Sequence, residues 1–172
     1  MRPVRRLLVL VLSVLAVLAL AAVPASAASD DYPWRTDTTW TSDSYGFTKR
    51  QCTSFVAWRL AQRRAPIKNA ASGWGNARNW DDTAHRLGIV RSPRPKVGAV
   101  AQWNSYETSP FYGSGSSWAN GTMKAGSLGH VAYVQVVHAD GSATVSQYNA
   151  NGSRTYSTLR VRAPRYLYVG LG

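Results

Sequence analysis

The chain has only one cysteine, Cys52, so no disulfide can form within it. Secreted domains of this size usually contain paired cysteines when they contain any. Cys52 therefore pairs with a second chain, lies inert in the core, or reacts with a substrate. The residues around Cys52 distinguish these three roles.

The N-terminal residues are typical of an export signal. Arg2, Arg5 and Arg6 precede an apolar run over residues 7–23, and Pro24-Ala25-Ser26-Ala27 follows it. The run lies near or below the ~20 residues that span a bilayer, which disfavours a permanent membrane anchor. A basic start, an apolar centre and an Ala-x-Ala ending predict a secretory signal peptide over residues 1–27. We therefore expect a secreted, extracellular protein.

Acidic residues are scarce: the chain has 8 Asp and Glu against 20 Lys and Arg. Without residues 1–27, which include three arginines and no acid, the formal charge falls from +12 to +9. Such a surface attracts phosphate-bearing polymers, either in a cell wall or in nucleic acid. Nucleic acid is disfavoured because the chain is expected to be exported and its basic residues are scattered over several elements.

A helix is predicted to begin at Cys52. Apolar residues at Phe55, Trp58 and Leu60 form one face, and Pro66 marks the end of the pattern. The first turn of a helix offers unbonded N–H groups and the positive end of the macrodipole, which favour a thiolate. A core cysteine more often lies inside the apolar stripe. The pattern therefore favours a reactive Cys52 with a pKa below the usual ~8.5.

The rest of the chain predicts an α+β domain. A second helix is expected from the spacing of Ala77, Trp80, Ala84 and Leu87, closed by Gly88. Strands are expected afterwards, at residues 97–103, 130–137, 142–148, 155–161 and 165–169. Helices followed by strands indicate an antiparallel sheet. The Ser- and Gly-rich segment 105–129 is predicted to be a long loop, either a mobile lid or a disordered insertion.

A cysteine nucleophile needs a base, and His130 is the best of the three histidines. His85 lies beside the apolar stripe of a helix and His138 precedes a hairpin turn, which favours surface positions for both. A two-residue turn at 140–141 sets His130 opposite Asn151, whereas a four-residue loop sets it opposite Asn149. Both registers keep His130, Gln147 and Asn149 on one face. Such a cluster is either a buried hydrogen-bonded group or, with Cys52, a base and its orienting amide.

Five stretches carry a resemblance to a known family: "GFTKRQCTSFVAWRL", "GNARNWDDTAHRLGI", "PRPKVGAVAQW", "GHVAYVQVV" and "VSQYNANG". In this order they resemble the CHAP domain, the cysteine, histidine-dependent amidohydrolase/peptidase family. The resemblance implies a papain-like α+β fold, related to the NlpC/P60 enzymes, with N-terminal helices packed on an antiparallel β-sheet. It also implies a secreted cysteine amidohydrolase or endopeptidase that cleaves amide bonds in peptidoglycan. The catalytic domain is then expected over residues 40–172, after an N-terminal segment at 28–39.

The resemblance assigns roles to individual residues. Cys52 takes the position of the nucleophile, His130 that of the base, and Asn149 that of a polar residue that holds the imidazole through its second nitrogen. Gln147 is a supporting residue at a position where many members have Glu. The backbone N–H of Cys52 is the first candidate donor to an oxyanion, and Gln51 is the second.

Further expectations concern the substrate groove, metals and partners. Trp80 and Trp103 are candidate groove walls, although each is more often a core residue. Some members of the family bind calcium through acids near the cysteine, but Asp43 is the only acid within ten residues of Cys52, so we predict no metal and no cofactor.

Expected partners are peptidoglycan and anionic wall polymers, and the protein is expected to be a monomer outside the cell or at the cell wall. Because Gln147 replaces Glu, the alternative is a non-catalytic wall-binding or toxin-like interaction protein on the same fold.

Overall fold

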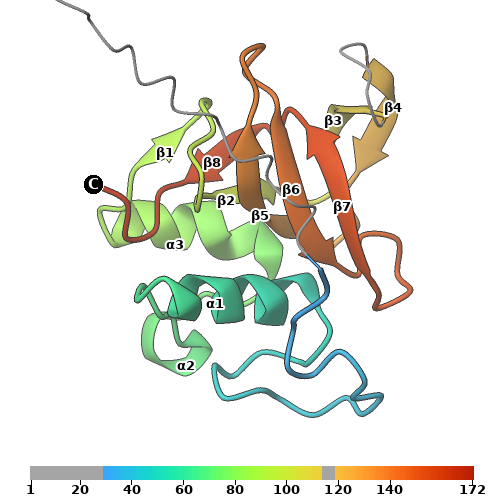
Figure 1. Cartoon of the computed structure of the whole chain (residues 1–172). Coiled ribbons are helices and arrows are strands. Elements are labelled where there is room, and N and C mark those ends of the chain that lie inside the picture. Colours follow the sequence, from blue (N-terminus) through green and yellow to red (C-terminus); the bar gives the residue numbers. More distant parts are fainter. Residues whose placement is uncertain (1–28, 114–118) are drawn as a thin grey trace, which may run out of the picture.

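The computed structural model describes residues 29–113 and 119–172, in which helices precede a large antiparallel sheet (Figure 1). The predicted signal peptide at residues 1–27 lies outside the described residues. The elements are α1 (Cys52–Gln62), α2 (Asn69–Ser72), a 3-10 turn (Ala77–Asn79), α3 (Trp80–Arg86), β1 (Arg91–Ser92), β2 (Val100–Trp103), β3 (Thr108–Tyr112), β4 (Ala119–Lys124), β5 (His130–Val137), β6 (Ala143–Tyr148), β7 (Tyr156–Val161) and β8 (Arg165–Leu167). None of the helices in these ranges is long and apolar enough to cross a membrane.

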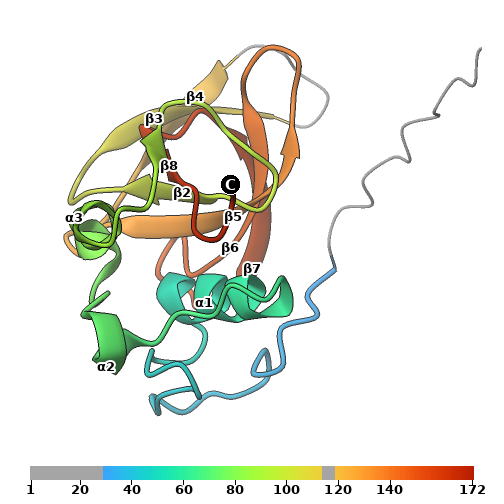
Figure 2. The same cartoon turned by 90° about the vertical axis from the view of Figure 1, so that its left-hand side faces the viewer.

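The strands form one eight-stranded sheet in the order β1-β8-β2-β5-β6-β7-β3-β4. Figure 2, turned by 90°, shows that this sheet curls around an interior and that α1 lies below it. The predicted antiparallel sheet is therefore present. The candidate base begins β5, a central strand of the sheet that pairs with β2 on one side and with β6 on the other.

The alternation of side chains along β5 builds two hydrophobic clusters, one on each face of the sheet. Val131 joins the cluster that contains Phe55 and Leu60 of α1. Ala132 and Val134 join the cluster inside the curl of the sheet. Burying each large apolar side chain stabilises the fold by roughly 1.5–3 kcal/mol. The helix that begins with Cys52 is thus attached to the strand that begins with His130.

The segment before the predicted catalytic domain is part of this core. Tyr32 is fully buried and its ring packs against Phe55 and Trp58 of α1. Its hydroxyl is hydrogen-bonded to Ser54, whose hydroxyl donates to the buried carboxylate of Asp43. A sequence pattern around a single tyrosine does not predict this packing.

The prediction of one long loop over residues 105–129 was wrong where two strands form. It contains β3 and β4, which pair with each other, while Phe111 of β3 pairs with Val161 of β7. Gly121, one of the glycines of this segment, lies opposite Phe111, whose ring comes within 2.6 Å of where a Cβ would be. The glycine therefore makes room for a cross-strand ring and does not mark a loop. Residues 114–118 of this segment lie outside the described part.

Candidate active site

Cys52 is the first residue of α1 and lies half-buried in a cleft of about 780 Å³. The preceding residue, Gln51, is extended and provides no side-chain cap, so the N–H groups of the first turn stay available. Backbone N–H groups of Val131, Thr53 and Cys52 are directed at the sulfur and lower the pKa of the thiol, but burial outweighs them and raises it above its usual range. The expectation of a lowered thiol pKa was therefore wrong, because it ignored burial.

His130 is the first residue of β5, and its side chain is buried. Its Nε2 lies 2.9 Å from Oε1 of Gln147, and Nε2 of Gln147 donates to the hydroxyl of Ser157 at 3.3 Å. An amide oxygen only accepts, so Nε2 of His130 carries the proton and Nδ1 has a free lone pair. Burial outweighs the hydrogen bond to Gln147 and lowers the pKa of His130 to about 4. The ring is therefore neutral near pH 7.

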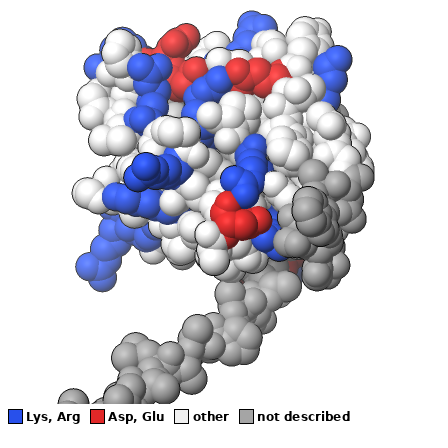
Figure 3. Space-filling model, turned by 90° about the horizontal axis from the view of Figure 1, so that it is seen from above, with Lys and Arg blue, Asp and Glu red and all other residues white. Residues whose placement is uncertain are grey.

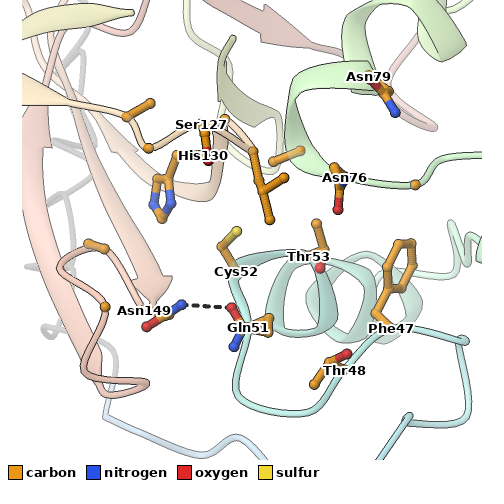
Figure 4. A pocket seen from close by; sticks show the side chains of 18 of the residues that line it. Phe47, Thr48, Gln51, Cys52, Thr53, Asn76, Asn79, Ser127, His130 and Asn149 are labelled. Carbon is orange, nitrogen blue, oxygen red and sulfur yellow. Dashed lines mark hydrogen bonds between the residues drawn. The ribbon is translucent and has the colours of Figure 1, made fainter. Parts of the chain in front are cut away.

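The side chains of Cys52 and His130 face the same cleft. Figure 4 shows the thiol of Cys52, from α1, and the ring of His130, from β5, both directed into the pocket. Both line the same cleft. A neutral thiol beside a neutral imidazole with a free lone pair can transfer its proton to the ring as it attacks a substrate.

Gly129 fixes where His130 begins its strand. Its φ is +74°, and a Cβ at this position would lie 2.5 Å from the backbone nitrogen of Arg78. The same stretch is anchored by a hydrogen bond from the N–H of Arg78 to the carbonyl of Leu128, 2.9 Å long. Only glycine combines this backbone conformation with so close an approach, which explains the Gly-His pair in the sequence.

The register of the β5–β6 hairpin decides which amide reaches His130. Val137 pairs with Ala143, but a bulge between Val134 and Val136 shifts the pairing, so that Tyr133 lies opposite Ser146. The shifted register, continued toward the site, is the one expected from the four-residue loop. It still places His130 and Gln147 on one face, as both predicted registers required.

Asn149 does not hold the imidazole in this structure; Gln147 does. Asn149 follows the end of β6 in a left-handed conformation with φ of +57°, and its side chain bonds to Gln51 and Arg154. Its Nδ2 donates to Oε1 of Gln51 at 2.6 Å, the bond drawn in Figure 4, and its Oδ1 accepts the N–H of Arg154 at 2.8 Å. Asn149 therefore fixes Gln51 at the edge of the cleft.

The two tryptophans predicted as groove walls lie elsewhere. Trp80 is fully buried and packs against Trp74 and Phe47. Trp103 is also fully buried, with its Nε1 donating to Ser109 at 2.9 Å and its ring 5.8 Å from that of His130. Both are core residues, and burying a large indole stabilises the fold by removing its apolar area from water.

The tryptophan that does line the cleft is Trp40, which is 71% exposed. Residues that the sequence did not assign to the cleft also line it, at the 3-10 helix and from the end of β4 into the loop before β5: Asn76, Ala77, Asn79, Lys124, Ala125, Gly126, Ser127 and Leu128. Among the described lining residues there is one cationic side chain, that of Lys124, and no carboxylate. Within residues 29–113 and 119–172 no three His, Cys, Asp or Glu side chains gather in a group that could hold a metal ion.

A thiol at a helix start beside an imidazole on a neighbouring strand is an arrangement that cysteine-dependent hydrolases use. The chain belongs to the CHAP domain family, whose model matches residues 40–149. This confirms the resemblance seen in the sequence.

Three relatives illustrate the likeness. The chain is 36% identical over 117 residues to the N-acetylmuramoyl-L-alanine amidase sle1 of Staphylococcus epidermidis, covering 66% of this chain and 29% of the relative. It is 31% identical over 156 residues to sle1 of Staphylococcus haemolyticus, covering 83% and 40%. It is 33% identical over 110 residues to the staphylococcal secretory antigen ssaA2 of Staphylococcus aureus, covering 64% and 32%. The chain thus spans well under half the length of these relatives.

A solved structure is also similar. The crystal structure of an N-acetylmuramoyl-L-alanine amidase from Staphylococcus aureus matches with a TM-score of 0.56 at 26% sequence identity. The match covers 80% of this chain and 36% of that one.

Proposed function

We propose that the protein is a secreted peptidoglycan hydrolase, a cysteine amidohydrolase or endopeptidase with a papain-like fold. The observation that carries the proposal is the placement of Cys52 and His130 in one cleft, with Nε2 of His130 tied to Gln147. The helix that carries the thiol packs on the sheet that carries the imidazole, through the cluster of Phe55, Leu60 and Val131. Membership in the CHAP family and likeness to wall amidases support peptidoglycan as the substrate.

In the first half of the reaction, Cys52 attacks the carbonyl carbon of the amide while its proton passes to Nδ1 of His130. A carbon–sulfur bond forms and the carbonyl oxygen becomes an oxyanion. When the oxyanion collapses, the carbon–nitrogen bond breaks and His130 gives its proton to the leaving amine. In the second half, His130 takes a proton from water, the hydroxide attacks the thioester, and the sulfur leaves with that proton.

The oxyanion is stabilised by donors at the start of α1. The N–H of Cys52 belongs to the first turn, where backbone groups have no acceptor within the helix. Gln51 lines the cleft beside it and is held there by Asn149 through the 2.6 Å bond. We assign Gln51 to the second donor position and Asn149 to positioning Gln51. The orientation of His130 then belongs to Gln147.

Export and retention at the wall complete the proposal. Residues 1–27 act as a signal peptide, the secreted monomer works outside the cell, and anionic wall polymers bind its basic surface. Figure 3 shows Lys and Arg side chains spread over one face, interrupted by Asp and Glu. Several arginines there and elsewhere are paired with acids, as Arg160 is with Asp140 at 2.9 Å. A dispersed charge of this kind favours weak retention on a polyanion and disfavours a nucleic-acid groove.

A non-catalytic wall-binding protein is the alternative, and turnover separates the two. Purified peptidoglycan is incubated with the wild-type protein and with Cys52→Ala, and released fragments are identified by mass spectrometry. We expect fragments from the wild type only, with circular dichroism and melting unchanged in the variant. Equal release by both proteins would remove Cys52 from the mechanism, and no release by either would favour the non-catalytic alternative.

A further inference from the structure

Trp40 is the most exposed large hydrophobic side chain among the described residues, at 71%, and it lines the cleft that contains Cys52. Exposing an indole to water loses the free energy that its burial would give, roughly 25 cal/mol per Å² of apolar area. Exposed apolar surface within a cleft commonly marks a place where a ligand binds. Trp80 and Trp103, by contrast, are buried in the same domain.

The ring of Trp40 is held by a fixed arginine. The guanidinium of Arg154 lies 4.1 Å from the ring centroid, within the range of a cation–π contact. The same guanidinium donates to three backbone carbonyls, those of Thr38 at 3.1 Å, Thr39 at 2.6 Å and Lys49 at 3.1 Å. An indole supported in this way loses little conformational entropy when a ligand stacks on it.

The backbone also ties Trp40 to the catalytic helix. The N–H of Lys49 donates to the carbonyl of Thr41 at 3.1 Å, and Ser42 bridges to Thr48. Trp40 therefore stands on a segment paired with the residues that lead into Cys52. On the other side, Arg154 closes the turn that Asn149 begins. The indole and the thiol consequently keep a fixed relation, as two subsites of one substrate require.

We propose that Trp40 is a sugar-stacking subsite that binds an amino-sugar ring of the glycan next to the bond that Cys52 attacks. This inference rests on the proposed function. Among the components of peptidoglycan, the sugar rings present flat C–H faces that match the face of an indole, whereas the stem peptides consist mainly of small and charged residues. A sugar at Trp40 directs Cys52 to an amide close to the glycan, the one that joins the sugar to the stem peptide.

The test measures binding without turnover, in protein that carries Cys52→Ala. The two probes are a disaccharide peptide, made of N-acetylglucosamine, N-acetylmuramic acid and a stem peptide, and the same stem peptide without sugars. Isothermal titration calorimetry gives the affinity for each. We expect the disaccharide peptide to bind more tightly, and Trp40→Ala to weaken its binding about tenfold, or about 1.4 kcal/mol, bringing the ratio of the two affinities close to one.

Two further variants sharpen the test. Trp40→Phe keeps an aromatic face and should retain part of the preference for the disaccharide peptide. Tyr168→Ala is the matched control, because Tyr168 is also an aromatic ring with a cation near it, Lys96 at 4.7 Å, and lies outside the cleft. It should keep the full preference, with melting recorded for every variant.

The proposed subsite would be contradicted if Trp40→Ala left the ratio of the two affinities unchanged. It would also be contradicted if the Cys52→Ala protein showed no preference for the disaccharide peptide. Neither result depends on catalysis, since the binding is measured in an inactive protein. The failure of the hydrolase proposal would show itself separately, as the absence of released wall fragments with wild-type protein.

Discussion

His130 and His138 stand at opposite ends of β5 and have different surroundings. His130 is buried, bonded to Gln147, and its pKa is lowered to about 4. His138 is partly exposed; its Nε2 lies 2.8 Å from the hydroxyl of Thr144, and its pKa is lowered by burial and by the charge of Arg160. Both are neutral near pH 7 and both have a hydrogen-bond partner. Only His130 shares a cleft with a thiol, so position relative to the nucleophile distinguishes the candidate base.

The largest contrast is expected from removing each imidazole. His130→Ala removes the group proposed to accept the proton of Cys52, so the rate of release of wall fragments should fall by roughly 10³-fold, within the range for loss of a general base. His138→Ala should leave the rate within about twofold of wild type, because no general-base role depends on it. Comparable losses in the two variants, measured by the same fragment assay, would mean that the base has been misassigned.

The residue before each histidine gives the second contrast. Gly129→Ala forces a Cβ to within 2.5 Å of the backbone of Arg78 and strains a left-handed backbone, so His130 must shift. A displacement near 1 Å can lower a rate by roughly 10²-fold. Val137→Ala, which shortens an exposed side chain before His138, should have almost no effect. Thermal melting accompanies the assay, and a fully active Gly129→Ala would show that the loop can move without displacing the imidazole.

The hydrogen-bond partners give the third contrast. Gln147→Ala frees the ring of His130 and should lower kcat at least ~10-fold through lost orientation, whereas Thr144→Ala beside His138 should not change it. Gln147→Glu places a carboxylate on Nε2, which raises the pKa of His130 and moves the acid limb of the pH–rate profile upward from its wild-type position near pH 4. An unmoved acid limb in Gln147→Glu would show that His130 does not set it.

Asn149→Ala provides a control within the site. It removes the bond that holds Gln51, so we expect a smaller fall in kcat and no movement of the acid limb. A shift of the acid limb in this variant would mean that Asn149, as the sequence predicted, interacts with the imidazole of His130.

The smallest contrast concerns folding stability in acid. The pKa of His130 is about 4 when folded and ~6.5 when unfolded, so between these values the unfolded chain binds more protons. The contribution of His130 to the free energy of unfolding is therefore fully present above pH 6.5. It decreases by about 3 kcal/mol as the pH falls to 4. Urea unfolding at several pH values should show a flatter profile in His130→Gln than in His138→Gln. Parallel profiles for the two variants would contradict the burial of an uncharged His130.

The sequence predicted the elements that have a clear hydrophobic period and missed those that do not. The start of α1 at Cys52 and the strand that begins at His130 follow from residue spacing, and both are present. The pair β3–β4 escaped prediction because Gly121, which accommodates Phe111, resembles a loop residue in a linear pattern. The alternation of side chains placed Gln147 and Asn149 on one face with His130, but it could not predict that Asn149 leaves the strand and bonds to Gln51.

Burial was the other quantity that the sequence could not provide. A helix start suggested an acidic thiol and two large indoles suggested groove walls, and each expectation failed because the environment of these side chains depends on tertiary packing. The role of Trp40 depends in the same way on Arg154, which lies more than a hundred residues away in the chain.

The raised pKa of Cys52 has a consequence for how well the thiol resists oxidation. Thiolates react with peroxides and are the first to enter the oxidation series that ends in sulfinic and sulfonic acids. A thiol that stays protonated reacts only slowly with peroxides. The chain has no second cysteine that could restore an oxidised Cys52 through a disulfide. The raised pKa therefore slows the oxidation of a thiol that no second cysteine of the chain can restore.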